Sequence, residues 1–585
     1  MDTKRKFQKN EELILNIDDL GKDGEGIGHV EGYTLFVKGA LPGETVRVSI
    51  MKAKKNMGFA RLLEIITPSP HRCEPVCPTA NQCGGCTLQH LSYEGQLAMK
   101  EKKVRDCLTR IGGVDLEQVE WLPIIGMTEG HLNYRNKAQF PVRPDENGEP
   151  VTGFFAGRSH RLIPTKECRI QHPVINQAAN IVMDFLREYH IPPYDEESHD
   201  GLVRHIYVRR GYHTGQVMVC LVVNGNSLPH AEELANRLQS MEGFTSLLLN
   251  VNQERTNVIL GREMKLLWGK AYIEDTIGQL RYRISAPSFY QVNPVQTVRL
   301  YETALCFAGL NGGETVWDLY CGIGTISLFL ARQLSEKHNS TGRVIGVEIV
   351  PEAVENAKEN ARLNGLDNAE FYCGAAEDVV AALVSEENHQ ADVVVVDPPR
   401  KGCDAKLLDT MVKMQPDRIV YVSCDPATLA RDVKVLGEQG YEVRKVQACD
   451  MFPGGGNVET VVMLSHKKPD SVINVKVEFG EGEGKVPLDN IAKRAEAYKP
   501  KERVTYKMIK EYIEAKYGFK VHTAYIAEVK RDLGLPMYDA PNVVEELKQP
   551  RKHPTPEKVE AIKDALKHFE VWNKREEKEN EIKNI

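Results

Sequence analysis

One stretch, Trp317-Asp318-Leu319-Tyr320-Cys321-Gly322-Ile323-Gly324-Thr325, decides the fold of this chain. It follows an apolar, strand-like run and opens a helical one, and its glycines permit a tight turn and a close approach of the backbone to a ligand. A dinucleotide-binding turn would carry a third glycine where this chain has Ser327. The D-x-x-x-G-x-G form therefore favours S-adenosylmethionine, whose sulfonium cation needs no phosphate cradle, over a nicotinamide dinucleotide.

The surroundings of this stretch, residues 313–466, alternate short β-branched runs with helical segments. Such alternation predicts a largely parallel sheet with helices on both faces, so we expect an α/β, doubly wound domain of seven strands. The expected strands are Thr315–Leu319, Arg343–Ile349, Ala369–Tyr372, Ala391–Asp397, Arg418–Ser423, Glu442–Cys449 and Glu459–Ser465.

Acidic residues stand where these strands end, at the edge where doubly wound sheets bind ligands. Asp318 lies near the end of the first strand and Glu348 near the end of the second, where an acid can accept hydrogen bonds from both ribose hydroxyls. The fourth strand ends in Asp397-Pro398-Pro399-Arg400, whose prolines fix a rigid turn that can hold a planar base. A plain strand terminator is the alternative, but it would not need Asp and Arg on either side.

A thiol follows the fifth strand, in Val422-Ser423-Cys424-Asp425-Pro426. A thiol at this edge suits methylation of uracil at C5. Uracil C5 is a poor nucleophile until a group adds at C6, and a thiolate is intrinsically very nucleophilic. Addition of Cys424 at C6 makes a C5 enolate that can attack the methyl sulfonium. The alternative interpretation of Cys424 is a small, buried apolar residue.

The same reaction needs a base that removes the C5 proton before the thiol is eliminated. Glu459 opens the last strand, after the loop Phe452-Pro453-Gly454-Gly455-Gly456, and an acid at the start of an otherwise apolar strand suits that role. An ordinary solvated strand end is the alternative. Ahead of the domain, Ser288-Phe289-Tyr290-Gln291-Val292-Asn293-Pro294 combines aromatics with amides, which can bind a base or simply join two domains.

The N-terminal part, residues 11–66, shows alternating apolar runs separated by Gly- and Pro-containing turns, which predicts a small five-stranded barrel. Five basic residues with no acid between them give it a basic edge that favours RNA contact over a solvated hairpin: Arg47, Lys52, Lys54, Lys55 and Arg61. A second basic cluster, residues 204–210, could equally contact RNA or be an ordinary strand face.

A cysteine-rich segment follows the barrel, as Cys77-x5-Cys83-Gly84-Gly85-Cys86. Clustered thiolates suit zinc or an iron–sulfur cluster, and zinc ribbons usually show two C-x2-C pairs where this segment has one. We therefore expect a [4Fe–4S] cluster, completed by the distant Cys168. Cys73 is an additional cysteine nearby, which leaves the choice of the four ligands open.

Composition excludes several classes of protein. The 585 residues are 42% hydrophobic and 27% charged, with a formal net charge of −7, so any basic surface must be local. No apolar run approaches the ~18 residues of a membrane span, and the first ten residues have no signal-peptide core. An odd number of cysteines, 13, in a long chain favours reduced thiols, so we expect a cytoplasmic protein.

The chain is too long for one hydrophobic core, and we expect four segments. They are a barrel at 1–70, a central α+β domain with the cysteines at 71–280, the doubly wound domain at 281–468, and a linker with a helical extension at 469–585. Charges in the extension are nearly balanced, so it could contact RNA or protein.

Together these motifs resemble the 23S rRNA (uracil-5-)-methyltransferases that carry a TRAM barrel, over about residues 10–466. The resemblance implies a class I S-adenosylmethionine-dependent fold and a flipped uridine of 23S rRNA as substrate, and we expect a monomer. It implies that Cys77, Cys83, Cys86 and Cys168 hold the [4Fe–4S] cluster. It implies cofactor contacts from Gln291, Tyr320, Glu348 and Asp397, substrate contacts from Phe289 and Asp397, Cys424 as nucleophile and Glu459 as base.

Four rivals remain. The same chemistry on transfer RNA is the nearest, but those enzymes usually lack the barrel and the cysteine cluster. A 5-methylcytosine enzyme would carry a second cysteine at the Asp397-Pro398-Pro399 turn. A non-catalytic iron–sulfur RNA-binding protein would not need both Cys424 and Glu459, and a nicotinamide-dependent oxidoreductase would leave both residues and the barrel unexplained.

Overall fold

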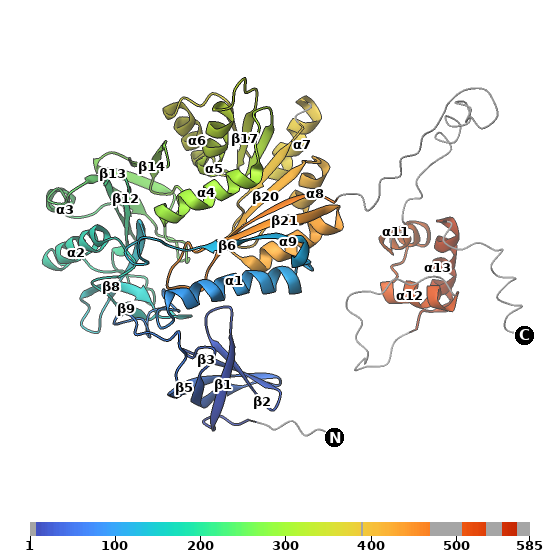
Figure 1. Ribbon diagram of the computed structural model, residues 1–585, viewed down its shortest axis with the longest axis horizontal. Coiled ribbons are helices and arrows are strands. Elements are labelled where there is room, and N and C mark those ends of the chain that lie inside the picture. The colour runs from blue at the N-terminus through green and yellow to red at the C-terminus, as the bar shows by residue number, and fades with distance from the viewer. Residues whose placement is uncertain (1–6, 388–389, 468–505, 534–552, 570–585) are drawn as a thin grey trace, which may run out of the picture. The chain divides into compact units, whose positions relative to one another are not determined.

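The computed structural model describes residues 7–387, 390–467, 506–533 and 553–569 (Figure 1). The chain divides into two compact units, Met1–Lys468 and Pro469–Ile585. In the part that is described, no helix is long and apolar enough to span a bilayer.

The first unit begins with the expected five-stranded barrel, which is closed in the order β1-β2-β3-β5-β4. Its strands are β1 (Glu12–Leu20), β2 (Gly26–Val30), β3 (Tyr33–Lys38), β4 (Thr45–Ala53) and β5 (Met57–Thr67). Alternate side chains of these strands fill the interior, among them Leu15, Leu35 and Val48, which are almost completely buried. The period-two pattern of the sequence therefore closes into a barrel.

A central sheet follows, with seven strands in the order β13-β12-β11-β10-β7-β8-β9. The strands are β7 (Lys137–Pro144), β8 (Pro150–Phe155), β9 (Leu162–Pro164), β10 (Val203–Arg210), β11 (Val217–Val223), β12 (Phe244–Val251) and β13 (Glu263–Gly269). The helices α2 (Pro173–Glu188) and α3 (Ala231–Leu238) bury their apolar faces with this sheet in one core. A separate hairpin, β14 (Tyr272–Ile277) and β15 (Leu280–Ser285), leads into the next domain.

The expected doubly wound domain is present, with all seven expected strands. They are β16 (Thr315–Leu319), β17 (Arg343–Glu348), β18 (Ala369–Cys373), β19 (Val393–Val396), β20 (Arg418–Ser423), β21 (Tyr441–Cys449) and β22 (Glu459–His466). The first five are parallel, and β22 runs antiparallel between β20 and β21.

Two groups of helices cover the two faces of this sheet. One face packs with α4 (Pro294–Ala308), α5 (Thr325–Ser335) and α6 (Pro351–Leu363). The other packs with α7 (Ala376–Glu387), α8 (Ala405–Lys413) and α9 (Pro426–Glu438). In β19 the buried valines alternate between the two cores, Val393 and Val395 in one and Val394 and Val396 in the other. A strand that is buried on both faces has a continuous apolar sequence, and the four valines of β19 fit this rule.

Two elements from the segment before residue 130 also belong to this layer. Strand β6 (Glu120–Ile125) pairs in parallel with β21 and becomes the eighth strand of the sheet. Helix α1 (Tyr93–Arg110) lies along α9, and its buried Val104 and Leu108 join the core of that face. Figure 1 shows both elements in blue beside the orange end of the sheet, so chain segments far apart in sequence build one domain.

The second unit contains three described helices, α11 (Tyr506–Tyr517), α12 (Thr523–Asp532) and α13 (Pro556–His568), around a small apolar core. Thr555 is the N-cap of α13 and Pro556 stands in its first turn, where the fixed φ of proline suits a helix. Of the expected linker and helical extension, residues 469–505, 534–552 and 570–585 lie outside the described residues.

Candidate active site

The glycine turn after β16 has the conformation that its sequence demands. The φ values of Tyr320, Gly322 and Gly324 are 72°, 57° and 81°. They lie in the left-handed region, which residues other than glycine rarely adopt. A Cβ on Gly324 would lie 3.2 Å from Phe371 and 3.3 Å from Ala357, so this glycine also permits close packing. Tyr320 carries a large side chain in strained backbone, and strain of this kind gathers at functional sites.

Acidic residues gather beside this turn. Glu348 accepts hydrogen bonds from the backbone N–H groups of Gly322, at 3.1 Å, and Val350, at 3.0 Å. Since a carboxylate has about four lone-pair positions, it keeps acceptor capacity for a ligand's hydroxyls. The exposed Ile349 follows directly and offers apolar surface at the same edge.

Asp318 lies beneath the turn and is buried. The Ser327 hydroxyl donates a 2.5 Å hydrogen bond to its Oδ2, and within the described residues its buried Oδ1 has no partner. Burial raises the pKa of Asp318 to about 7, against the hydrogen bond from Ser327, which lowers it. The sequence marked Ser327 only as a missing glycine, whereas its hydroxyl binds the acid at the strand end.

Cys424 and Glu459 lie beside the last paired position of two antiparallel strands. Ser423 is paired with Thr460 between β20 and β22, so Cys424, the residue after β20, and Glu459, the first residue of β22, lie at the same end of this strand pair. Cys424 is half-buried, and Glu459 is buried with 3% of its surface exposed. Asp397 follows the neighbouring strand β19 at the same edge, which brings three of the expected site residues together.

Burial and neighbouring charges shift the pKa values of the acids and the thiol at this edge. Burial first, and then the charge of Asp397, raise the pKa of Glu459 to about 8. Burial, Glu459 and Asp397 together raise the pKa of the Cys424 thiol to about 11, while the Arg400 guanidinium lowers both values. Burial and the charge of Asp318 raise the pKa of Asp397 to about 7. Such clusters of perturbed acids and thiols are typical of active sites.

The segment from Ser288 to Pro294 contributes one free aromatic ring and several buried anchors. Phe289 is 64% exposed. Tyr290 donates to Asp275 at 3.1 Å, and the carbonyl of the buried Gln291 accepts a 3.0 Å hydrogen bond from Asn136. The anchored neighbours hold the segment still, so that the ring of Phe289 faces solvent at a fixed place.

The basic cluster at residues 204–210 has a structural role. Arg204 and Arg209 are buried, and their guanidinium groups donate to backbone carbonyls rather than face solvent. Arg209 donates to the carbonyl of Ser288 at 2.7 Å, so it holds the loop that carries Phe289. The interpretation of this cluster as an RNA contact is therefore wrong for these two side chains.

The basic edge of the barrel is partly neutralised. Arg47 pairs with Glu64 of the neighbouring strand at 2.7 Å, which the order of residues along the chain does not reveal. Lys52, Lys54 and Lys55 are exposed on or beside β4. On another loop of the barrel, Lys22 reaches Asp425 at 3.0 Å, directly beside the Cys424 position.

Three thiols of the cysteine-rich segment, Cys77, Cys83 and Cys86, lie in one neighbourhood with the distant Cys168. Cys77 and Cys83 are electrostatic neighbours of both Cys86 and Cys168, and burial and these thiols raise the pKa of Cys86 to about 12. Cys73 is exposed, and its thiol donates a 3.4 Å hydrogen bond to the Gln89 carbonyl. Its charged neighbours are Arg72 and Glu74. All thirteen cysteines are free thiols.

Local contacts fix the backbone around these four thiols. Gly84 donates to the Phe155 carbonyl at 2.9 Å, and a Cβ on it would lie 2.8 Å from Gly157. The Asn176 amide makes hydrogen bonds to both the N–H and the carbonyl of Cys168. Across the described part of the chain, no three His, Cys, Asp or Glu side chains stand close enough to hold a single metal ion.

Comparison with known proteins assigns this architecture to a family. Residues 230–467 match the family described as tRNA (Uracil-5-)-methyltransferase, and residues 6–63 match the TRAM domain. An uncharacterized RNA methyltransferase of Halalkalibacterium halodurans is 51% identical over 460 residues, 78% of this chain and 98% of the relative. One of Clostridium tetani is 48% identical over 78% of this chain and 97% of the relative.

A solved structure supports the same assignment. The tRNA (uracil-54, C5)-methyltransferase of Pyrococcus abyssi, determined in complex with S-adenosyl-L-homocysteine, is 28% identical and superposes with a TM-score of 0.61. The match covers 77% of this chain and 100% of that chain. With an acidic edge suited to a cationic methyl donor and a TRAM barrel ahead of it, this chain belongs to the S-adenosylmethionine-dependent RNA uracil-5-methyltransferase family.

Proposed function

We propose that this protein forms 5-methyluridine in 23S rRNA, with Cys424 as nucleophile and Glu459 as base. One observation carries the proposal: the last β20–β22 pair, Ser423 with Thr460, has the Cys424 thiol and the buried Glu459 directly beside it, at the sheet edge where Asp397 also lies. The chemistry needs one nucleophile and one base at the same base ring, and this pair has that arrangement.

The proposed reaction consists of addition, methyl transfer and elimination. The Cys424 thiolate adds to C6 of uracil, and the electron pair of the C5=C6 bond becomes an enolate at C5. C5 takes the methyl group from the sulfonium of S-adenosylmethionine, which leaves as the neutral thioether. The Glu459 carboxylate then removes the C5 proton, the C5=C6 bond re-forms, and the C6–S bond breaks to release the Cys424 thiolate.

Cofactor contacts are proposed for Gln291, Tyr320, Glu348 and Asp397. The acidic edge complements the positive charge of the methyl donor, and the unpartnered Oδ1 of Asp318 leaves acceptor capacity there. Phe289 is proposed to stack on the extruded uridine, because its exposed ring can return ~1–3 kcal/mol of the cost of unstacking a base.

A [4Fe–4S] cluster is proposed on Cys77, Cys83, Cys86 and Cys168. These four thiols neighbour one another and Cys73 does not, which favours this set of ligands. Four thiolates are the usual donor set of such a cluster, and the segment lacks the second C-x2-C pair that zinc ribbons usually show. Bound there, the cluster would supply a structural cross-link between the segment at 77–86 and Cys168.

We prefer 23S rRNA as substrate because the motifs taken together resemble the 23S rRNA enzymes; the barrel alone does not discriminate, since the match to the Pyrococcus abyssi enzyme covers 77% of this chain. Transfer RNA is the second candidate, since the matching family and the Pyrococcus abyssi enzyme are both named as tRNA methyltransferases. The thirteen free thiols suit a cytoplasmic protein, and a monomer suffices because Met1–Lys468 contains every proposed site residue.

The test is methyl transfer from labelled S-adenosylmethionine to unmodified 23S rRNA and to unmodified tRNA, side by side. We expect label in 23S rRNA as 5-methyluridine, and none with Cys424→Ala. Label in tRNA instead would overturn the substrate assignment and leave the chemistry intact. An active Cys424→Ala variant, or no transfer to either RNA by folded protein, would overturn the proposed mechanism.

A further inference from the structure

The loop between β21 and β22, residues 450–458, determines where the proposed base lies. Cys449 and Glu459 are cross-strand partners, so the loop begins and ends at this pair. Nothing in the proposed chemistry uses the loop itself. Any shift of its backbone would nonetheless move Glu459, because Glu459 is the first residue after it.

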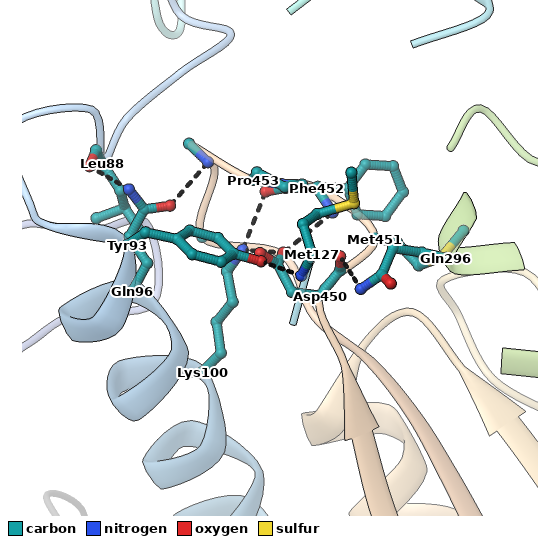
Figure 2. A network of polar contacts seen from close by, with 12 residues as sticks. Leu88, Tyr93, Gln96, Lys100, Met127, Gln296, Asp450, Met451, Phe452 and Pro453 are labelled. Carbon is teal, nitrogen blue, oxygen red and sulfur yellow. Dashed lines mark hydrogen bonds and ion pairs between the residues drawn. The ribbon is translucent and has the colours of Figure 1, made fainter. Parts of the chain in front are cut away.

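Helix α1 holds this loop through three side chains on one of its faces, Gln96, Lys100 and Lys103, which we call the α1 stripe. Residues spaced by four and three positions lie above one another on a helix. The Gln96 Oε1 accepts a 2.8 Å hydrogen bond from the N–H of Gly454, while its Nε2 donates to the Leu88 carbonyl at 3.1 Å. Figure 2 shows Gln96 and Lys100 reaching from the helix toward the loop.

Lys100 is the centre of the stripe. Its ammonium donates to Asp450 Oδ1 at 2.5 Å and to the Phe452 carbonyl at 3.0 Å, and the Lys100 and Asp450 side chains are both fully buried. Asp450 Oδ1 also accepts from the N–H of Phe452 at 3.1 Å. The ion pair thus fixes the first turn of the loop directly after the strand end.

Lys103 holds the other end of the loop. Its ammonium donates to the Gly456 carbonyl at 2.8 Å and to the Lys22 carbonyl of the barrel at 3.3 Å. The α1 stripe therefore contacts the beginning, the middle and the end of the loop.

The opposite side of the loop is held from α4 and the central domain. Gln296 donates to the carbonyl of Asp450 at 3.0 Å, and Asn293 donates to the carbonyl of Met451 at 3.2 Å. Tyr134 donates to the carbonyl of Pro453 at 3.1 Å. Side-chain donors on two sides thus fix consecutive carbonyls, which leaves the loop little freedom to relax.

A buried ion pair of this kind is a poor source of stability. Removing two charges from water costs about as much as their attraction returns, and well-packed apolar residues often serve as well. Within the described residues the other oxygen of Asp450, Oδ2, has no hydrogen-bond partner, which adds to the cost. An ion pair with hydrogen bonds holds its charged atoms in a defined position and direction, which an apolar contact does not do.

We propose that Lys100 and the α1 stripe are positioning residues that hold Glu459 at the C5 proton, an inference that rests on the proposed function. Lys100 acts through Asp450 and the loop and does not itself touch the base. Since proton removal is the last chemical step, a displaced Glu459 leaves the earlier steps intact. The intermediate with Cys424 bonded to C6 and the methyl group on C5 then accumulates as a covalent protein–RNA complex.

The experiment compares four variants of the full chain on whichever RNA the wild-type enzyme methylates. Lys100→Met/Asp450→Asn removes both charges, so that no unpaired charge is left buried, and keeps a side-chain oxygen that can accept from Phe452. We expect 5-methyluridine formation to fall ~10²-fold, the loss that a misplacement of about 1 Å produces. We also expect a covalent complex on denaturing gels, as with Glu459→Gln.

Two variants keep the test decisive. Lys103→Met removes the bond to Gly456 from a half-buried position, so it should fold even if the double variant does not, and should show the same complex more weakly. Lys102→Met is the matched control, because this lysine of the same helix pairs at the surface with Asp19 and Asp106. It should neither slow product formation nor trap a complex.

Accumulation of the complex by the folded double variant or by Lys103→Met, with Lys102→Met unaffected, supports the inference. Equal loss of complex and product in these variants, or product formation at the wild-type rate, overturns it. If the wild-type protein forms no product and Glu459→Gln traps no complex, the proposed function has failed instead, so the two failures are distinguishable.

Discussion

At the scale of single residues, the site is governed by protonation. The pKa of Glu459 is raised to about 8 and that of Cys424 to about 11, chiefly by burial, so both hold protons at neutral pH. The proposed reaction uses the deprotonated form of each. The Arg400 guanidinium opposes both shifts from the neighbouring turn.

We therefore expect methyl transfer to accelerate as pH rises. Raising the pH increases the thiolate fraction of Cys424 throughout the neutral and mildly alkaline range, and it increases the carboxylate fraction of Glu459 steeply only below about pH 8. The logarithm of the rate should climb steeply below about pH 8 and less steeply above it. Initial rates with labelled S-adenosylmethionine between about pH 6.5 and 9.5 measure this profile. A rate that is flat or falling across this range contradicts the assignment of Glu459.

Arg400→Met tests the cause of the profile. Loss of its positive charge makes the Glu459 carboxylate less favourable, which raises the pKa of Glu459 further. The bend, the pH at which the slope of the rate profile decreases, therefore moves to higher pH. The neighbouring Lys401 is also exposed, so Lys401→Met is the control and should leave the bend in place. Equal shifts in both variants would show that general surface charge, and not the Arg400 contact, sets the bend.

At the scale of elements, two glycines in helical surroundings have opposite requirements. Gly324 is the N-cap of α5 with a φ of 81°, whereas Gly437 lies in the last turn of α9 with open space at its Cβ position. A side chain at Gly324 must adopt left-handed backbone, and its Cβ must fit 3.2 Å from Phe371. A side chain at Gly437 meets neither problem.

We expect Gly324→Ala to reduce the free energy of unfolding by about 1–2 kcal/mol, the usual cost of left-handed backbone for an L-residue. It should also weaken binding of S-adenosylmethionine, because the turn moves. Gly437→Ala should stabilise the protein by at most about 0.5–1 kcal/mol, the gain in a helix interior, because Gly437 lies in the last turn of α9. Chemical denaturation and calorimetric titration measure both quantities. Equal effects of the two substitutions would contradict this account.

At the scale of the whole molecule, the methyltransferase sheet is not a contiguous stretch of chain. Strand β6 closes one edge of the sheet against β21, and α1 covers α9 with the buried Val104 and Leu108. A chain that begins at residue 281 lacks both elements. It would expose an apolar face and an unpaired strand edge, a combination that favours aggregation.

We expect residues 281–467 alone to unfold without a cooperative transition and to bind a hydrophobic dye. Residues 71–467 retain β6 and α1 and should unfold cooperatively. Circular dichroism during thermal unfolding, together with dye fluorescence, distinguishes the two fragments. A cooperative transition of the shorter fragment at the midpoint of the longer one would show that β6 and α1 are dispensable for folding.

The sequence by itself determined the elements and the chemistry of the strand ends. Its alternating runs predicted the closed barrel and all seven strands of the doubly wound sheet, because buried strands and helices leave distinct periods in the chain. The parallel order of these strands puts their ends at one edge, so the acids near Asp318 and Asp397 and the thiol of Cys424 could be placed there from local patterns alone.

Tertiary structure alone decided the contacts between distant segments. The eighth strand β6, the bond from Ser327 to Asp318, and the pairing of Arg47 with Glu64 depend on folded geometry. The same holds for the burial of Arg204 and for the Lys100–Asp450 pair, which joins residues 350 positions apart. A local pattern records which face of an element is apolar, but not which partner covers it, because that partner is fixed only when the whole chain packs.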